Sequence, residues 1–169
     1  ISPDIILIDG REYEISKKII EKNPNAIVII DAGNNRDDVK ELCLLADYVV
    51  CSKVFAEDVS GIKVTNIESL NAIMDNLEKQ FLTKVVITLE SDGSCYRGSD
   101  NSIRVIPSIN VKANDTTGAG DIFHGAFAYF IGNKYPLREA IRYSSITAAI
   151  SVTRIGARFS IPDLKEVLE

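Results

Sequence analysis

The stretch Lys84-Val85-Val86-Ile87-Thr88-Leu89 is a run of apolar and β-branched residues, and it predicts a fully buried strand. Shorter runs of the same kind precede it at residues 5–8, 26–30 and 48–51. Between these runs, residues 13–22, 37–45 and 67–80 show the apolar spacing of amphipathic helices. Because strands that alternate with helices form a parallel sheet covered on both faces, we predict a three-layer α/β/α fold with a mostly parallel sheet.

The pattern changes after the strand predicted at residues 84–89. Ser91-Asp92-Gly93 predicts a turn, and two short strands at residues 94–97 and 103–106 flank a polar tip, which is typical of a β-hairpin. Two helices are expected at residues 122–131 and 137–152, with Pro136 at the first helical position of the second. A short last helix is expected near Pro162. Since no linker-like or repeated stretch interrupts the chain, we expect one domain over residues 1–169.

The composition excludes several classes of function. The 169 residues carry 19 basic and 24 acidic side chains, so the chain lacks the positive charge of a nucleic-acid binder, and its apolar runs are too short to span a membrane. Cys43, Cys51 and Cys95 are too widely spaced for a disulfide framework or a CxxC metal site, which favours free thiols in a reducing cytoplasm. His124 is the single histidine, and a His-rich metal site is therefore excluded.

The most informative motif is Asp115-Thr116-Thr117-Gly118-Ala119-Gly120-Asp121, which leads directly into an apolar helix. Small residues at 118–120 leave backbone N–H groups accessible at a helix N-terminus, where the helix dipole attracts negative charge and phosphate above all. Asp121 would project from the first helical turn beside this anion hole, where it could hold and deprotonate a hydroxyl group. The pattern therefore favours phosphoryl transfer. The alternative is that Asp115 and Thr116 merely cap a closely packed helix.

The longer string from Asp115 to Phe127 resembles the C-terminal signature of the ribokinase or PfkB family of carbohydrate kinases. Residues 86–93 resemble the strand and nucleotide loop that precede this signature, and residues 140–157 resemble the helix and turn that follow it. The resemblance implies a ribokinase-like fold and ATP-dependent phosphorylation of a hydroxyl on a sugar or sugar-like molecule. It also implies roles for Asp121 as general base and for Gly118, Ala119 and Gly120 as the anion hole.

The same resemblance implies where ATP or ADP and metal ions would bind. The nucleotide set is Ser52, Thr88, Leu89, Glu90, Ser91, Asp92, Gly93, Ser145, Ile155 and Gly156. Many family members hold a monovalent cation such as K⁺ beside the anion hole, and the matching positions are Asp115, Thr117, Ser151, Arg154, Gly156 and Ser160. Mg²⁺ is expected to accompany ATP.

Two positions depart from the family pattern. Ser52-Lys53-Val54-Phe55 stands where the family often has an Asn-x-x-Glu element that organises magnesium, although it resembles the fructokinase-like and ketohexokinase-like variant. Glu57 or Asp58 is a candidate substitute for the missing glutamate. Glu90 stands where the nucleotide loop usually has glycine, which puts a carboxylate near the phosphates.

The resemblance also bears on how the chain is organised. Its opening residues match mid-chain sequence of the family, so we expect the chain to correspond to the C-terminal, ATP-binding half, without the N-terminal sugar-binding and lid portion. The complete protein could form a homo-oligomer. Two alternatives stay open: a non-catalytic nucleotide-binding regulatory domain of the same fold, and a kinase for a nucleoside or a vitamin precursor. His124 is expected to be a helix-packing residue, and Asp31 is expected directly after a strand.

Overall fold

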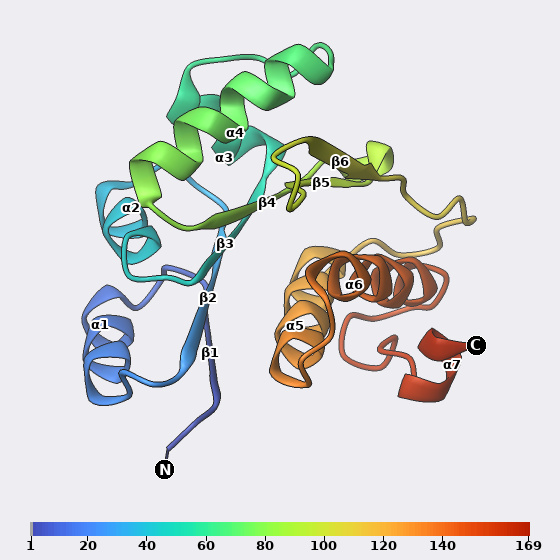
Figure 1. Ribbon diagram of the computed structural model, residues 1–169. Coiled ribbons are helices and arrows are strands. Elements are labelled where there is room, and N and C mark those ends of the chain that lie inside the picture. The colour runs from blue at the N-terminus through green and yellow to red at the C-terminus, as the bar shows by residue number, and fades with distance from the viewer. Residues whose placement is uncertain (1) are drawn as a thin grey trace. The chain divides into compact units, whose positions relative to one another are not determined.

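The computed structural model describes residues 2–169, which form two compact units (Figure 1). The first unit comprises residues 2–90 and 94–105, and the second comprises residues 91–93 and 106–169. Residue 1 lies outside the described part. That residues 1–169 fold as one domain stays a prediction.

The first unit is built on a sheet whose strands follow one another in chain order. The first four strands pair in parallel, and the fifth pairs antiparallel to the fourth. The strands are β1 (Ile5–Ile8), β2 (Ile27–Ala32), β3 (Tyr48–Ser52), β4 (Lys84–Thr88), β5 (Ser94–Arg97) and β6 (Ile103–Ile106). Crossovers between parallel strands are right-handed, so a sheet that grows in one direction receives its connecting helices on one face. Figure 1 shows α1, α2 and α4 on the same side of β1–β4.

The helices of this unit are α1 (Tyr13–Lys22), α2 (Asp37–Cys43), α3 (Lys53–Ser60) and α4 (Ile67–Phe81). Local signals set two of their ends. The Asn66 side chain accepts a hydrogen bond from the Ser69 N–H and the Ser69 hydroxyl accepts one from the Asn66 N–H, which is a capping box at the start of α4. Gly61 ends α3 in the left-handed conformation that glycine adopts at low cost.

Alternation along the strands divides the buried residues between the two faces of the sheet. Val28, Ile30, Val49 and Ile87 lie on the face that packs against the helices, where they form one core with residues such as Phe55. Each of these side chains is at most 3% exposed, and burial of one such side chain contributes about 1.5–3 kcal/mol. This core fixes the positions of the strand ends.

The second unit is helical, and its long helices α5 (Ala119–Gly132) and α6 (Leu137–Val152) pack against each other. Phe130 of α5 contacts Tyr135 and Tyr143, with ring centroids 5.1 and 5.2 Å away. The short helix α7 (Leu164–Leu168) packs on α6. A single 3₁₀ turn, η1 (Glu90–Asp92), lies between β4 and β5 in the chain. This unit carries the sequence motif at residues 115–121.

Most predicted elements are present, and the differences have physical causes. Helix α3 was not expected, and it forms because Ser52 caps its first turn by accepting a hydrogen bond from the Phe55 N–H. Asp31 lies within β2, not after it. Helix α5 begins at Ala119 instead of residue 122, and Pro136 is the N-cap of α6 instead of its first helical residue. Among residues 2–169, none of the helices has the length and apolar character needed to cross a bilayer.

Candidate active site

The start of α5 exposes backbone donors. Gly118 is the N-cap with a φ of +74°, and no side chain caps the helix. Within residues 2–169, the N–H groups of Gly118, Gly120 and Asp121 have no hydrogen-bond acceptor. The prediction of a free N–H at Ala119 is wrong, because this group donates to the Thr116 carbonyl over 3.2 Å. The free donors at the positive end of the helix dipole can bind an anion.

The loop before α5 is attached to the end of α6. The Asn114 and Asp115 N–H groups both donate to the Val152 carbonyl, over 2.7 and 3.1 Å. The Asn114 side-chain amide donates to the Thr153 carbonyl over 2.6 Å. These bonds satisfy carbonyls that the last turn of α6 leaves without helical partners, and they fix the loop that carries the donors.

Asp115 holds the loop in a second way. One carboxylate oxygen accepts a hydrogen bond from the Thr117 N–H and the other from the Gly156 N–H, each over 2.9 Å. The Thr117 side chain, followed by these two backbone groups, lowers the pKa of Asp115 from its usual 3.8 to about 2. Asp115 therefore stays ionised and joins the loop to the turn at Gly156.

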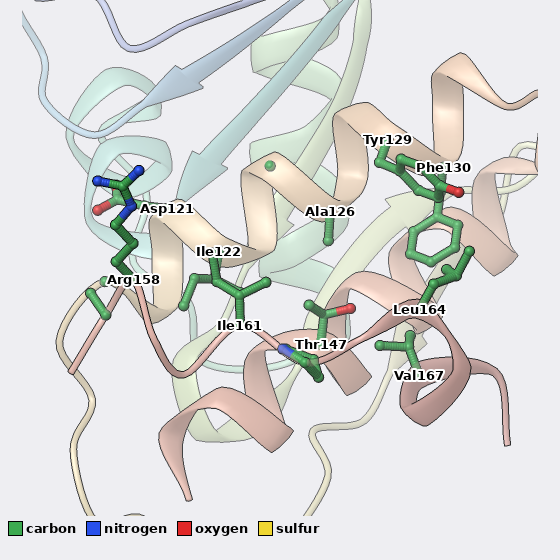
Figure 2. A pocket seen from close by; sticks show the side chains of 14 residues that line it. Asp121, Ile122, Ala126, Tyr129, Phe130, Thr147, Arg158, Ile161, Leu164 and Val167 are labelled. Atoms are coloured by element: carbon green, nitrogen blue, oxygen red, sulfur yellow. The ribbon is translucent and has the colours of Figure 1, made fainter. Parts of the chain in front are cut away.

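Asp121 lies in the first turn of α5 with its carboxylate exposed, and it lines a pocket of about 560 Å³. Figure 2 shows Asp121 and Arg158 at one end of this pocket and Phe130, Leu164 and Val167 at the other. Most of the other residues that line the pocket are apolar, and its charged side chains, Asp121 and Arg158, both lie at one end. A carboxylate next to free N–H donors can orient a hydroxyl group toward an anion bound at the helix start.

Close packing at Gly118 fixes the segment that follows Gly156. A methyl group on Gly118 would lie 2.7 Å from the Ala157 Cβ and 3.8 Å from the Asp121 Oδ2. Gly118 is thus required by its positive φ and by the approach of Ala157. In contrast, nothing lies within 4 Å of a methyl group on Gly120, so space beside that residue is open.

The six residues implied for a monovalent cation come from three segments that hydrogen-bond to one another. Asp115 and Thr117 lie in the loop, Ser151 lies in the last turn of α6 with Arg154 just beyond it, and Gly156 and Ser160 lie in the turn that follows. Their oxygens suit a hard cation. The Arg154 guanidinium pairs with Glu166, so only the Arg154 carbonyl is a suitable ligand. Within residues 2–169, no group of three or more His, Cys, Asp or Glu side chains forms a metal site.

Four residues implied for nucleotide binding belong to the first unit. Ser52 caps α3, and the Thr88 hydroxyl at the end of β4 donates to the Cys51 carbonyl over 3.3 Å. Leu89 is buried and Glu90 is exposed. Glu90 has a φ of +56°, in the left-handed region that favours glycine. Glycine would adopt this conformation without strain, so glutamate is the less favourable residue here.

The other implied nucleotide residues belong to the second unit. The Ser108 hydroxyl donates to the Ser91 carbonyl, Asp92 is exposed, and Gly93 has a φ of +97°. A methyl group on Gly93 would lie 2.0 Å from the Ile106 carbonyl oxygen, so only glycine fits. The Ser145 hydroxyl donates to the Ile141 carbonyl of its own helix, Ile155 is 82% exposed, and Gly156 has a φ of +86°.

The departure at residues 52–55 has a structural explanation. Phe55 is fully buried in the core of the first unit and stacks on Phe81, with ring centroids 6.3 Å apart. The Glu57 carboxylate accepts hydrogen bonds from the Lys63 ammonium group (2.8 Å) and the Val64 N–H (2.9 Å), which lower its pKa. Glu57 is therefore occupied in a loop contact. Phe55 and Glu57 therefore do not fit a magnesium-organising role, whereas the other candidate, Asp58, is exposed.

His124 has the expected packing role. It is buried on α5, and its Nδ1 hydrogen-bonds to the Gly120 carbonyl over 2.7 Å. Sequence reasoning missed Arg158 and Asn114. Asn114 directly precedes the motif and could have been recognised as a capping residue, whereas nothing in the sequence places Arg158 near Asp121 until the contact between Gly118 and Ala157 is known.

The comparisons with known proteins identify the family. The sequence matches the pfkB family of carbohydrate kinases over residues 10–164, and the chain belongs to this family. It is 33% identical to a ribokinase of Haemophilus influenzae over 156 residues, which are 92% of this chain and 50% of that protein. It is 37% identical to a ribokinase of Staphylococcus aureus over 128 residues, which are 75% of this chain and 42% of that protein. The family resemblance is thereby confirmed.

Solved structures confirm the fold class. The crystal structure of ribokinase from Thermotoga maritima matches with a TM-score of 0.78 and 29% identity, over 98% of this chain and 55% of that one. The structure of Arabidopsis thaliana ribokinase complexed with ribose and ATP matches with a TM-score of 0.84 and 26% identity, over 98% and 55%. The fold is a ribokinase-like α/β fold. The chain spans about half the length of the curated relatives it matches.

Proposed function

We propose that this chain carries the phosphoryl-transfer site of an ATP-dependent kinase that acts on a hydroxyl group of a sugar or sugar-like molecule. The observation that carries this proposal is the start of α5, where the free N–H groups of Gly118, Gly120 and Asp121 adjoin the exposed Asp121 carboxylate. Similarity to ribokinases supports the substrate class, and the ribose and ATP in the Arabidopsis thaliana structure support the pairing of sugar and nucleotide.

Each group at the site has a role in the proposed reaction. The Asp121 carboxylate accepts a hydrogen bond from the acceptor hydroxyl and orients its oxygen toward the γ-phosphorus of ATP. The new oxygen–phosphorus bond forms as the bond to the β,γ-bridging oxygen breaks, ADP leaves, and Asp121 takes the hydroxyl proton. The free N–H groups stabilise the charge of the transferring group. Because this transition state is loose, positioning and electrostatics supply most of the catalysis.

Metal ions enter the proposal to different degrees. The oxygens of the loop, the end of α6 and the Gly156 turn fit a monovalent cation such as K⁺, which would help to fix the anion-binding loop. Mg²⁺ would neutralise phosphate charge when bound with ATP. No step depends on a protein ligand to Mg²⁺, since Phe55 and Glu57 do not fit that role. The implied nucleotide residues at 52, 88–93, 145, 155 and 156 are part of the same proposal.

Phosphorylation of a panel of acceptors by the natural full-length protein tests this proposal. The panel contains ribose, deoxyribose, fructose, a nucleoside and a hydroxymethyl-pyrimidine, with ATP, magnesium and either potassium or a large organic cation. We expect phosphorylation of a sugar that is faster in potassium. Phosphorylation of the nucleoside or the pyrimidine alone would overturn the sugar assignment.

A regulatory role is the second candidate, and the buried Phe55 together with the strained Glu90 favours it. Under this alternative, nucleotide binds without phosphoryl transfer to any acceptor of the panel. Titration of the natural full-length protein with ADP, run beside the activity assay, separates the two. Binding with transfer supports the kinase, and binding without transfer supports the regulatory domain.

A further inference from the structure

Arg158 lines the same pocket as Asp121, and the two side chains lie at the same end of it (Figure 2). Two other arginines of the second unit, Arg142 and Arg154, form ion pairs with Glu139 and Glu166. In the described part of the chain, by contrast, the Arg158 guanidinium has neither an ion pair nor a hydrogen bond. Its positive charge is therefore available to a ligand beside the Asp121 carboxylate.

The backbone that carries Arg158 is held against the start of α5. Ala157, the residue before it, approaches Gly118 so closely that a methyl group on Gly118 would lie 2.7 Å from the Ala157 Cβ. The Gly156 N–H donates to Asp115, and the Ser160 N–H donates to the Gly156 carbonyl over 3.0 Å. These contacts fix the backbone at Arg158 beside the start of α5, where the free N–H groups lie.

We propose that Arg158 binds the transferring phosphoryl group and is a further catalytic residue of the site. This inference rests on the proposed kinase function. As the acceptor oxygen attacks the γ-phosphorus and the bond to ADP breaks, negative charge lies on the oxygens of the transferring group. The planar guanidinium has several N–H donors whose spacing matches two such oxygens, so it complements the backbone donors at Gly118 and Gly120.

The position of Arg158 indicates that its ligand is the transferring phosphoryl group and not a charged group of the acceptor. Ala157 contacts the N-cap of α5, so the side chain of the next residue starts from the anion-binding end of the pocket. The opposite end is lined by Phe130, Leu164, Val167 and Tyr129, none of which carries a positive charge for a second anion. An acceptor with its own phosphate or carboxylate would also be attracted by Arg158, and the experiment distinguishes this case.

Steady-state kinetics of the variant Arg158→Gln in the natural full-length protein test the proposal. With ATP and a neutral sugar, we expect kcat to fall about 10²-fold, as for the loss of one donor to a developing oxyanion, with little change in either KM. Arg158→Lys should recover part of the loss because it keeps the charge. Arg142→Gln is the matched control, since it removes a surface arginine of α6, and it should leave kcat unchanged.

A binding measurement without turnover tests whether Arg158 contacts the transferring group and not ADP itself. Aluminium fluoride with ADP mimics the transferring group, so it should raise the affinity of the parent protein for ADP, and Arg158→Gln should lose this gain while binding ADP alone as before. Unchanged kcat in Arg158→Gln would overturn the inference, as would an effect limited to the KM of a negatively charged acceptor. If Asp121→Asn abolishes turnover while Arg158→Gln does not, the proposed function stands and only this inference fails.

Discussion

Replacement of Gly118 by alanine should destabilise the second unit, because two independent costs meet at this residue. Its φ of +74° lies in the left-handed region, where a residue with a Cβ atom loses about 1–2 kcal/mol relative to its relaxed conformation. The new methyl group would also lie 2.7 Å from the Ala157 Cβ, and relief of such overpacking costs about 1–3 kcal/mol. We expect the free energy of unfolding to fall by roughly 2–5 kcal/mol.

Two further variants make this prediction specific. Gly120→Ala adds the same methyl group two residues later, inside α5, where nothing lies within 4 Å. Because alanine favours a helix interior over glycine, Gly120→Ala should be neutral or stabilising by about 0.5–1 kcal/mol. The double variant Gly118→Ala with Ala157→Gly removes the overlap but not the unfavourable φ. It should recover about 1–3 kcal/mol relative to Gly118→Ala alone.

The assay is urea unfolding followed by circular dichroism, with the midpoints and slopes of the four proteins compared. Equal stability of Gly118→Ala and the parent protein would refute the account of the loop. Equal destabilisation by Gly118→Ala and Gly120→Ala would refute it as well, since the structure separates the two sites. No recovery in the double variant would show that Ala157 does not lie against Gly118.

Two other predictions concern Asp115, in the loop before α5, and Glu90, in the turn after β4. Asp115→Asn should lower the thermal midpoint above pH 4, because a carboxylate with a lowered pKa stabilises the fold while it is ionised. The difference in thermal midpoint from the parent protein should shrink as the pH falls from about 4 to about 2. A difference that stays constant over this range in melting curves would contradict the role of the charge. Glu90→Gly should raise the free energy of unfolding by up to about 1 kcal/mol, because glycine adopts the φ of +56° without strain. The variant should also bind ADP more tightly, because it removes a carboxylate. Weaker ADP binding in a titration would contradict this second expectation.

The sequence predicted those parts of the fold that periodicity and capping determine. The strand at Lys84 and the helix at Tyr13 begin where the apolar pattern indicates. Helix α3 was missed because eight residues after a strand give little periodicity, and only the Ser52 cap marks its start. Helix α5 starts three residues earlier than its apolar run, since glycine and alanine carry no hydrophobic signal.

The candidate site was predictable in part for the same reason. The motif indicates an anion-binding helix start with Asp121 beside it, because residue type and spacing are enough for that inference. They do not show that the Ala119 N–H is taken up by Thr116, or that Asp115 spans 41 residues to reach Gly156. The nearness of Arg158 to Asp121 depends on how the turn after α6 packs against Gly118, which no local pattern encodes.

The most direct test of the central claim is the turnover of Asp121→Asn in the natural full-length protein, at saturating ATP and sugar. Asparagine keeps the size of the side chain and its place in the first turn of α5, but it cannot take up the hydroxyl proton. If phosphoryl transfer occurs at this helix start, kcat should fall by about 10²–10⁴-fold while ADP binding is retained. Unchanged kcat with the same sugar would contradict the account.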